Sequence, residues 1–113
     1  EGKRLPFAQA ATGAIGIETL LSLSLEMHHN DSLSLTKIVE TLTINPARIL
    51  KINKGTLKKG SEADICVFDL DKPWVVNADN LKSKSKNSAI EGRKLQGKVV
   101  MTFLNGEVVF KSQ

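Results

Sequence analysis

His28 and His29 are the only histidines in the 113 residues, and they are adjacent. Neighbouring residues of a helix point about 100° apart, so this pair does not converge on one metal ion. The chain has no H-x-H, H-E-x-x-H or C-x-x-C pattern and no serine in a G-x-S-x-G turn. We interpret the pair as helix-end or surface residues, where a positive charge suits the helix dipole. We therefore expect neither a metal ligand nor a catalytic residue in this chain.

A second candidate is the segment Thr12-Gly13-Ala14-Ile15-Gly16, which precedes a predicted helix. Backbone N–H groups at the start of a helix are able to hold an anion. Two glycines without a third, and without a preceding strand, do not make a dinucleotide-binding fingerprint. The glycines also have a purely conformational interpretation, in which they let the chain turn before the helix. The residues alone leave both interpretations open.

The carboxylates have structural interpretations. Glu18 is expected in the first turn of the helix, where its charge suits the N-terminal end of the dipole. Asp64 and Asp69 flank a predicted strand, and we expect them to end that strand rather than to catalyse.

The chain carries a net charge of +4, from 16 basic and 12 acidic residues. Part of the excess is local, because Lys82, Lys84 and Lys86 alternate with serines. No aromatic residue lies between these lysines to stack on bases. We interpret the segment as a solvated loop and expect no nucleic-acid partner.

The single cysteine, Cys66, lies in an apolar run and has no partner for an internal disulfide. A small buried thiol in a reducing compartment is the simplest interpretation, and it favours the cytoplasm. No apolar stretch approaches the roughly 20 residues needed to cross a bilayer, so we expect no membrane partner. The start, Glu1-Gly2-Lys3-Arg4, lacks the apolar core of a signal peptide.

The elements that would position these residues are helices in the first half of the chain. Apolar residues between 15 and 27 recur at helical spacing, and Leu21 and Leu25 share a face with one of the histidines. A second helix is predicted to start after Ser34 as N-cap. A third is predicted to begin at Asn45-Pro46, where the asparagine caps and the proline loses only an unpaired donor.

The second half predicts strands separated by turns. We expect a strand over 63–69 that is buried on both faces, a short strand over 74–76, a long polar loop over 77–97, and a hairpin of 98–104 with 107–110. Asn105-Gly106 suits the two-residue turn of this hairpin. Helices followed by strands indicate an α+β fold, and strands this few indicate an incomplete domain.

Four segments together resemble the C-terminal portion of class I dihydroorotases, members of the amidohydrolase superfamily. They are residues 5–19, residues 43–50 with the pattern Asn-Pro-Ala-Arg, residues 55–69, whose first ten residues fit G-x-L-x-x-G-x-x-A-D, and residues 83–106. The chain departs from the family at Ala11-Thr12 and Ala89-Ile90, which stand where Pro-Phe is frequent.

The resemblance implies an α+β fragment of a (β/α)8 metal-dependent hydrolase. Residues 1–52 would be the last helical part of the barrel, and residues 53–113 would be strands of a small composite β-sandwich domain. The implied partners are the N-terminal barrel portion of the same enzyme and a second copy in a homo-oligomer. The family's metal-binding motifs would all lie upstream, with the last of them just before Glu1.

The implied activity is the zinc-dependent, reversible cyclisation of N-carbamoyl-L-aspartate to L-dihydroorotate in pyrimidine biosynthesis. Zinc would belong to the parent enzyme, and we expect none on this fragment and no activity from it alone. The family's substrate-contacting loop matches Thr12 and Gly13, which become the candidate substrate-binding residues and favour the anion-binding interpretation. Two alternatives remain: a non-catalytic remnant that acts as a binding or structural subunit, and a fragment of a related cyclic-amide hydrolase such as a dihydropyrimidinase or allantoinase.

Overall fold

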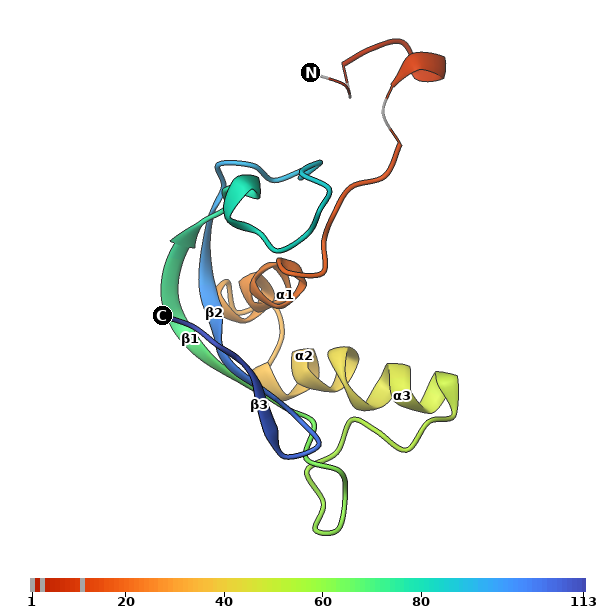
Figure 1. Ribbon diagram of the computed structural model, residues 1–113, viewed down its shortest axis with the longest axis vertical. Helices are drawn as coiled ribbons and strands as arrows, with labels where there is room; N and C mark the ends of the chain where they lie inside the picture. Colours follow the sequence, from red (N-terminus) through yellow and green to blue (C-terminus); the bar gives the residue numbers. More distant parts are fainter. Residues whose placement is uncertain (1, 3, 11) are drawn as a thin grey trace.

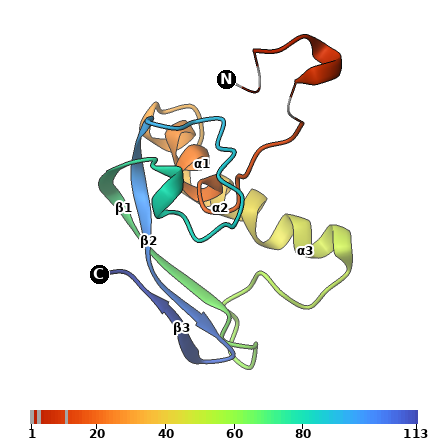
Figure 2. The same cartoon turned by 45° about the horizontal axis from the view of Figure 1, so that its top comes forward.

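A computed structural model describes residues 2, 4–10 and 12–113 and shows an α+β arrangement (Figure 1). Within these residues the elements are η1 (Phe7–Gln9), α1 (Leu20–His29), α2 (Leu35–Leu42), α3 (Ile44–Leu50), β1 (Ile65–Val75), η2 (Ala78–Asn80), β2 (Lys94–Leu104) and β3 (Glu107–Lys111), where η denotes a short 3-10 helix. Helix α1 lies against β2, α2 and α3 follow one another away from the sheet, and the N-terminal segment projects from the body (Figures 1 and 2).

Helix α1 begins later than its sequence pattern predicts. Residues 17–19 form a turn, in which both the backbone N–H and the hydroxyl of Thr19 donate to the carbonyl of Gly16, each at 3.2 Å. The buried face of the helix carries Ser22 and Leu25, and Leu25 has no exposed surface. The prediction that Glu18 lies in the first helical turn is wrong, because Glu18 precedes the N-cap Thr19.

Helices α2 and α3 differ in how their starts are capped. The hydroxyl of Ser34 accepts from the backbone N–H of Lys37 at 3.3 Å, which confirms the predicted N-cap of α2. Helix α3 begins two residues earlier than predicted, with Thr43 as an N-cap that makes no side-chain capping bond. Asn45 and Pro46 therefore lie within the first turn, so the predicted capping by Asn45 is wrong. Pro46 remains tolerated there because first-turn N–H groups have no partner within the helix.

The sheet is antiparallel with the strand order β1-β2-β3. Strand β1 joins the two predicted strands 63–69 and 74–76 across an irregularity between Asp69 and Pro73. It is not buried on both faces as predicted, since Val67 is 41% exposed. Strand β2 begins at Lys94 rather than Lys98, because its first three residues pair with the end of β1. The long polar loop therefore ends at residue 93.

The β2–β3 hairpin confirms the local prediction at Asn105-Gly106. Leu104 pairs with Glu107, and the φ angles of the two turn residues are 50° and 83°. Both values are positive, as the type I′ turn requires. The N–H of Gly106 also donates to the carbonyl of Ala63 at 3.0 Å, which joins the hairpin turn to the chain just before β1.

The core of the described residues is small, and much apolar surface faces outward. The fully buried large side chains are Leu25, Ile38 and Val76. By contrast, Phe7 is 99% exposed and Ile17 is 94% exposed. Exposed apolar surface of this extent is typical of a face that another protein segment covers. Among the described helices, none has the length and apolar character needed to span a membrane.

Candidate functional site

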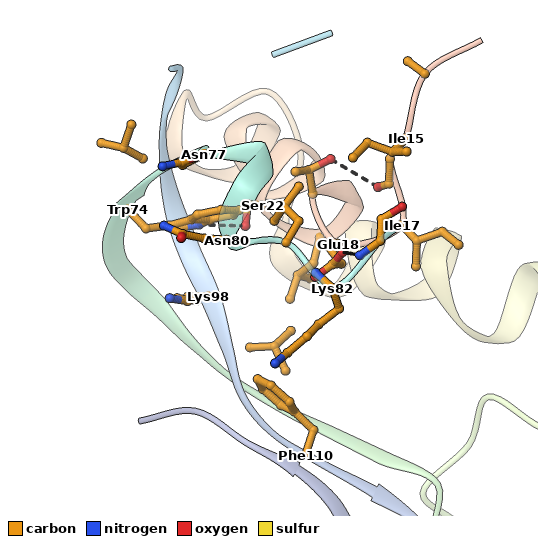
Figure 3. A pocket seen from close by; sticks show the side chains of 18 residues that line it. Ile15, Ile17, Glu18, Ser22, Trp74, Asn77, Asn80, Lys82, Lys98 and Phe110 are labelled. Atoms are coloured by element: carbon orange, nitrogen blue, oxygen red, sulfur yellow. Dashed lines mark hydrogen bonds between the residues drawn. The ribbon is translucent and has the colours of Figure 1, made fainter. Parts of the chain in front are cut away.

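An open cavity of about 870 Å³ lies between the start of α1, the loop after β1, and the sheet (Figure 3). Its walls are mainly apolar, and the large apolar side chains that line it are Ile15, Ile17, Leu21, Trp74, Val75, Leu81, Val99 and Phe110. Two basic residues, Lys82 and Lys98, also line it. Figure 3 shows the Lys82 side chain extending toward Phe110, and the Lys98 ammonium lies 5.7 Å from the centre of the Trp74 ring.

A hydrogen-bonded cluster joins α1 to the sheet on one side of this cavity. The carbonyl of Gly97 accepts from the Ser22 hydroxyl at 2.5 Å and from the Trp74 indole N–H at 2.9 Å. The Ser22 hydroxyl also lies 3.2 Å from the same indole nitrogen. Because Ser22 is buried and its polar atoms are satisfied, this cluster holds α1 against β2 without an unpaired group.

Thr12 and Gly13, the predicted substrate-binding residues, lie on an exposed loop beside the cavity. Neither lines it, whereas the next residue, Ala14, does. Gly13 has a φ of +68°, a conformation that favours glycine, and among the described residues no atom beyond its chain neighbours lies within 4 Å of where a Cβ would stand. The requirement at Gly13 is therefore for backbone conformation rather than for space. Ala11, one of the positions that depart from the dihydroorotase pattern, is outside the described residues.

The carboxylate of Glu18 holds the basic loop predicted to be merely solvated. Its Oε1 accepts from the backbone N–H of Lys82 at 2.9 Å, and its Oε2 accepts from that of Ser83 at 3.1 Å (Figure 3). Asn87 makes a second connection, since its Nδ2 donates to the carbonyl of Gly13 at 2.9 Å. Neither role was predicted from the sequence. The family resemblance of residues 83–106 was the one sequence feature that could have indicated a structural role for this loop.

The histidines do not form a metal site in the described part of the chain. Their ring centroids are 5.6 Å apart with the planes tilted by 57°. The Nε2 of His29 lies 3.1 Å from the carbonyl of Leu70 and 3.9 Å from a carboxylate oxygen of Asp71. No group of three or more His, Cys, Asp or Glu side chains placed to hold a metal ion occurs among the described residues. These residues therefore do not fit a zinc centre.

Cys66 is exposed, which corrects the prediction of a buried thiol. Its neighbour Val67 is also exposed, so this part of β1 is open to solvent. Partial burial nevertheless raises the pKa of the Cys66 thiol, because desolvation penalises the thiolate. The thiol is thus held in its less nucleophilic form.

Asp64 flanks β1 as predicted, but the prediction that Asp69 ends the strand is wrong, because Asp69 lies inside β1. Asp64 directly precedes β1 and accepts from the backbone N–H of Asn105 at 2.8 Å and from Lys54 Nζ at 2.6 Å. Lys54 also donates to the Glu62 carboxylate. Asp69 Oδ1 accepts from two backbone N–H groups, those of residues 71 and 72, at the irregularity of the strand.

Replacing Asp64 by asparagine is expected to reduce the acid sensitivity of the fold. The hydrogen bond from Lys54, followed by that from Asn105, holds the pKa of Asp64 below its ordinary value. A carboxylate whose pKa is lower in the folded state stabilises the fold above its unfolded pKa of about 4, and this contribution is lost as the pH falls through the folded pKa. Melting temperatures measured between about pH 2 and pH 7 should therefore fall less steeply in Asp64→Asn than in the wild type. The matched control is Asp79→Asn, which makes the same change at another exposed aspartate; equal flattening by both variants would contradict the assignment.

Comparisons with known proteins agree with one another on the family. A model described as the Amidohydrolase family matches residues 6–109. The dihydroorotase of Ehrlichia chaffeensis is 43% identical over 111 residues, which are 98% of this chain and 25% of that protein. The dihydroorotase of Aquifex aeolicus is 45% identical over 102 residues, which are 90% of this chain and 24% of that protein.

Solved structures of two cyclic-amide hydrolases share the fold. A D-hydantoinase superimposes with a TM-score of 0.87 at 28% identity, covering 98% of this chain and 25% of that one. The L-hydantoinase (dihydropyrimidinase) from Arthrobacter aurescens superimposes with a TM-score of 0.84 at 37% identity, covering 92% of this chain and 24% of that one. The chain thus spans about a quarter of the length of the proteins it matches. Since the family match extends over most of the sequence, the chain belongs to the amidohydrolase family.

Proposed function

We infer that this chain is the C-terminal part of a dihydroorotase, a cytoplasmic zinc enzyme that reversibly cyclises N-carbamoyl-L-aspartate to L-dihydroorotate. The observation that carries this proposal is the identity of 43% to proteins named dihydroorotase, extending over 98% of the chain. A second dihydroorotase, from Aquifex aeolicus, reaches 45% over a similar span. Agreement over nearly the whole chain, rather than over one motif, supports the specific activity.

In this proposal the described residues contribute structure and substrate contact rather than metal chemistry. His28 and His29 diverge, and the His29 ring is already engaged with the carbonyl of Leu70. Zinc would be held by residues elsewhere in the parent protein. The candidate contacts to substrate are at Thr12 and Gly13, on the exposed loop beside the cavity.

The exposed apolar side chains support a larger assembly. Ile49 is 80% exposed and Leu57 is 81% exposed, in addition to the exposed residues of the N-terminal segment. We propose that the N-terminal barrel portion of the same enzyme covers much of this surface and that the enzyme is a homo-oligomer. Residues 1–52 would complete the barrel, and residues 53–113 would contribute strands to the small domain.

A cyclic-amide hydrolase of the dihydropyrimidinase type is the second candidate. The observation that favours it is the TM-score of 0.84 and 37% identity to the L-hydantoinase (dihydropyrimidinase) from Arthrobacter aurescens. The test is to assay the complete, metal-loaded parent protein with dihydroorotate and, separately, with dihydrouracil and hydantoin. Turnover of dihydroorotate is the expected result. Turnover of dihydrouracil or hydantoin alone would overturn the proposal in favour of the second candidate, and no turnover of any of them would favour a non-catalytic remnant.

The substitution Gly13→Val in the complete enzyme tests the substrate contact. A β-branched residue strongly disfavours the φ of +68° found at Gly13, so the loop backbone should shift. The expected result is a KM for dihydroorotate raised about tenfold or more, with the zinc content unchanged. Gly60→Val is the matched control, because Gly60 has a φ of +87°, has equally open space, and lies in a distant turn. An unchanged KM in Gly13→Val would exclude this loop from substrate binding.

A further inference from the structure

Two loops that are far apart in the sequence are fastened together at the start of α1. We call residues 12–18 the α1 loop and residues 81–88 the Ser/Lys loop. At one end, Asn87 Nδ2 donates to the carbonyl of Gly13 at 2.9 Å, and the backbone carbonyl of Asn87 accepts from the N–H of Ile15 at 3.0 Å. Ile15 and Ser88 form an isolated parallel bridge at the same place. Asn87 thus contacts the α1 loop through both its side chain and its backbone.

The other end of the contact is made by Glu18. Its two carboxylate oxygens accept from successive backbone N–H groups, those of Lys82 at 2.9 Å and Ser83 at 3.1 Å. Hydrogen bonds to a charged acceptor are stronger than those between neutral groups. The Ser/Lys loop is therefore attached to the α1 loop at both ends, by partners 64 to 74 residues away in the sequence.

Hydrophobic packing does little to hold the α1 loop. None of the described residues from 4 to 18 is buried, and Phe7 and Ile17 are almost fully exposed. The loop also contains no helix or strand beyond the single bridge at Ile15. The hydrogen bonds to the Ser/Lys loop therefore contribute to the position of the α1-loop backbone. They also give the lysine- and serine-rich segment a defined path.

We propose that Asn87 and Glu18 are positioning residues, which hold the backbone at Thr12 and Gly13 in the geometry that binds substrate. This role rests on the proposed function of the α1 loop. By holding the Gly13 carbonyl, the Asn87 amide orients the peptide plane after Gly13, while Glu18 holds the other end of the loop at the start of α1. Neither side chain needs to touch the substrate for its loss to weaken binding.

The test is steady-state kinetics of the complete, metal-loaded parent enzyme with dihydroorotate. Asn87→Ala and Asn87→Asp both remove the donor to the Gly13 carbonyl, and each should raise KM about fivefold to tenfold with kcat within about twofold of the wild type. Glu18→Ala should act similarly. Glu18→Gln, which keeps one acceptor oxygen, should restore much of the affinity. Asn53→Ala is the control, because Asn53 is exposed and lies far from both loops along the chain.

Hydrogen–deuterium exchange on the same proteins tests the contact independently of activity. The amides of Lys82 and Ser83 should exchange faster in Glu18→Ala than in the wild type, and Glu18→Gln should lie between them. Three results would overturn the positioning role. They are unchanged exchange of the Lys82 and Ser83 amides in Glu18→Ala, an unchanged KM in Asn87→Ala, and a loss of kcat that is accompanied by a loss of bound zinc. An inactive wild type would overturn both the proposed function and the role that rests on it, whereas an active wild type with an unaltered KM in Asn87→Ala would overturn only the latter.

Discussion

Replacing Gly97 by alanine is expected to lower the free energy of unfolding of the 113-residue chain by about 2–5 kcal/mol. Gly97 lies in β2 with a φ of +102°, where a side chain is strained. An added Cβ would stand 2.5 Å from Leu25 Cδ1 and 3.3 Å from the carbonyl oxygen of Leu70. Since Leu25 is fully buried, its side chain cannot relieve this contact by turning into solvent without leaving the core. Any shift would also disturb the hydrogen bonds from Ser22 and Trp74 to the Gly97 carbonyl.

Urea denaturation followed by tryptophan fluorescence measures this effect directly. Trp74 is the only tryptophan of the chain, and its indole N–H donates to the Gly97 carbonyl. The matched control is Gly92→Ala, since Gly92 also has a positive φ, of +77°, but no atom of the described residues beyond its chain neighbours lies within 4 Å of an added Cβ. The control should cost about 1–2 kcal/mol, the price of backbone strain alone. Equal losses in the two variants would show that the contact with Leu25 has no part in the effect.

Leu25→Ala is expected to lower the free energy of unfolding by about 2–5 kcal/mol, because it leaves a cavity between α1 and β2. Leu25 has 0% exposure, whereas Leu20 on the same helix is 55% exposed. Leu20→Ala is therefore the control and should cost less than about 1 kcal/mol. The same urea titration, with matched m-values, makes the comparison.

The double variant Gly97→Ala with Leu25→Ala connects these two predictions. Removing the leucine side chain also removes the atom that an alanine at position 97 would strike. The double variant should therefore lose less stability than the sum of the two single losses, by about 1 kcal/mol or more. Strict additivity would indicate that the two residues do not share a contact in solution.

Prediction from the sequence succeeded where the stabilising partners are close along the chain. The Ser34 cap acts on Lys37, three residues later, and the Asn105-Gly106 turn requires only that two successive residues have positive φ. The family could also be recognised, because its motifs are short runs of residue types that survive in order. Such features depend on a few neighbouring residues, whatever the rest of the chain does.

Prediction failed where partners from distant segments decide the conformation. The sequence predicts that Glu18 favours the dipole of its own helix, but its carboxylate accepts hydrogen bonds from the backbone N–H groups of Lys82 and Ser83. The sequence predicts two separate strands, over 63–69 and 74–76, but pairing with β2 joins them into the single strand β1. The spacing of apolar residues along the chain cannot predict either outcome, because the partner segment lies tens of residues away.

The sequence by itself determined the amidohydrolase family, the order of helices and strands, the α2 cap, and the turn between β2 and β3. It also identified Thr12 and Gly13 as the candidate contact to substrate, which stays a prediction. Only the tertiary structure decided which groups hold that loop, because Asn87 and Glu18 act across 64 to 74 residues of chain. It likewise decided that position 97 favours glycine, since the positive φ and the close approach of Leu25 both arise from how β2 packs in the fold.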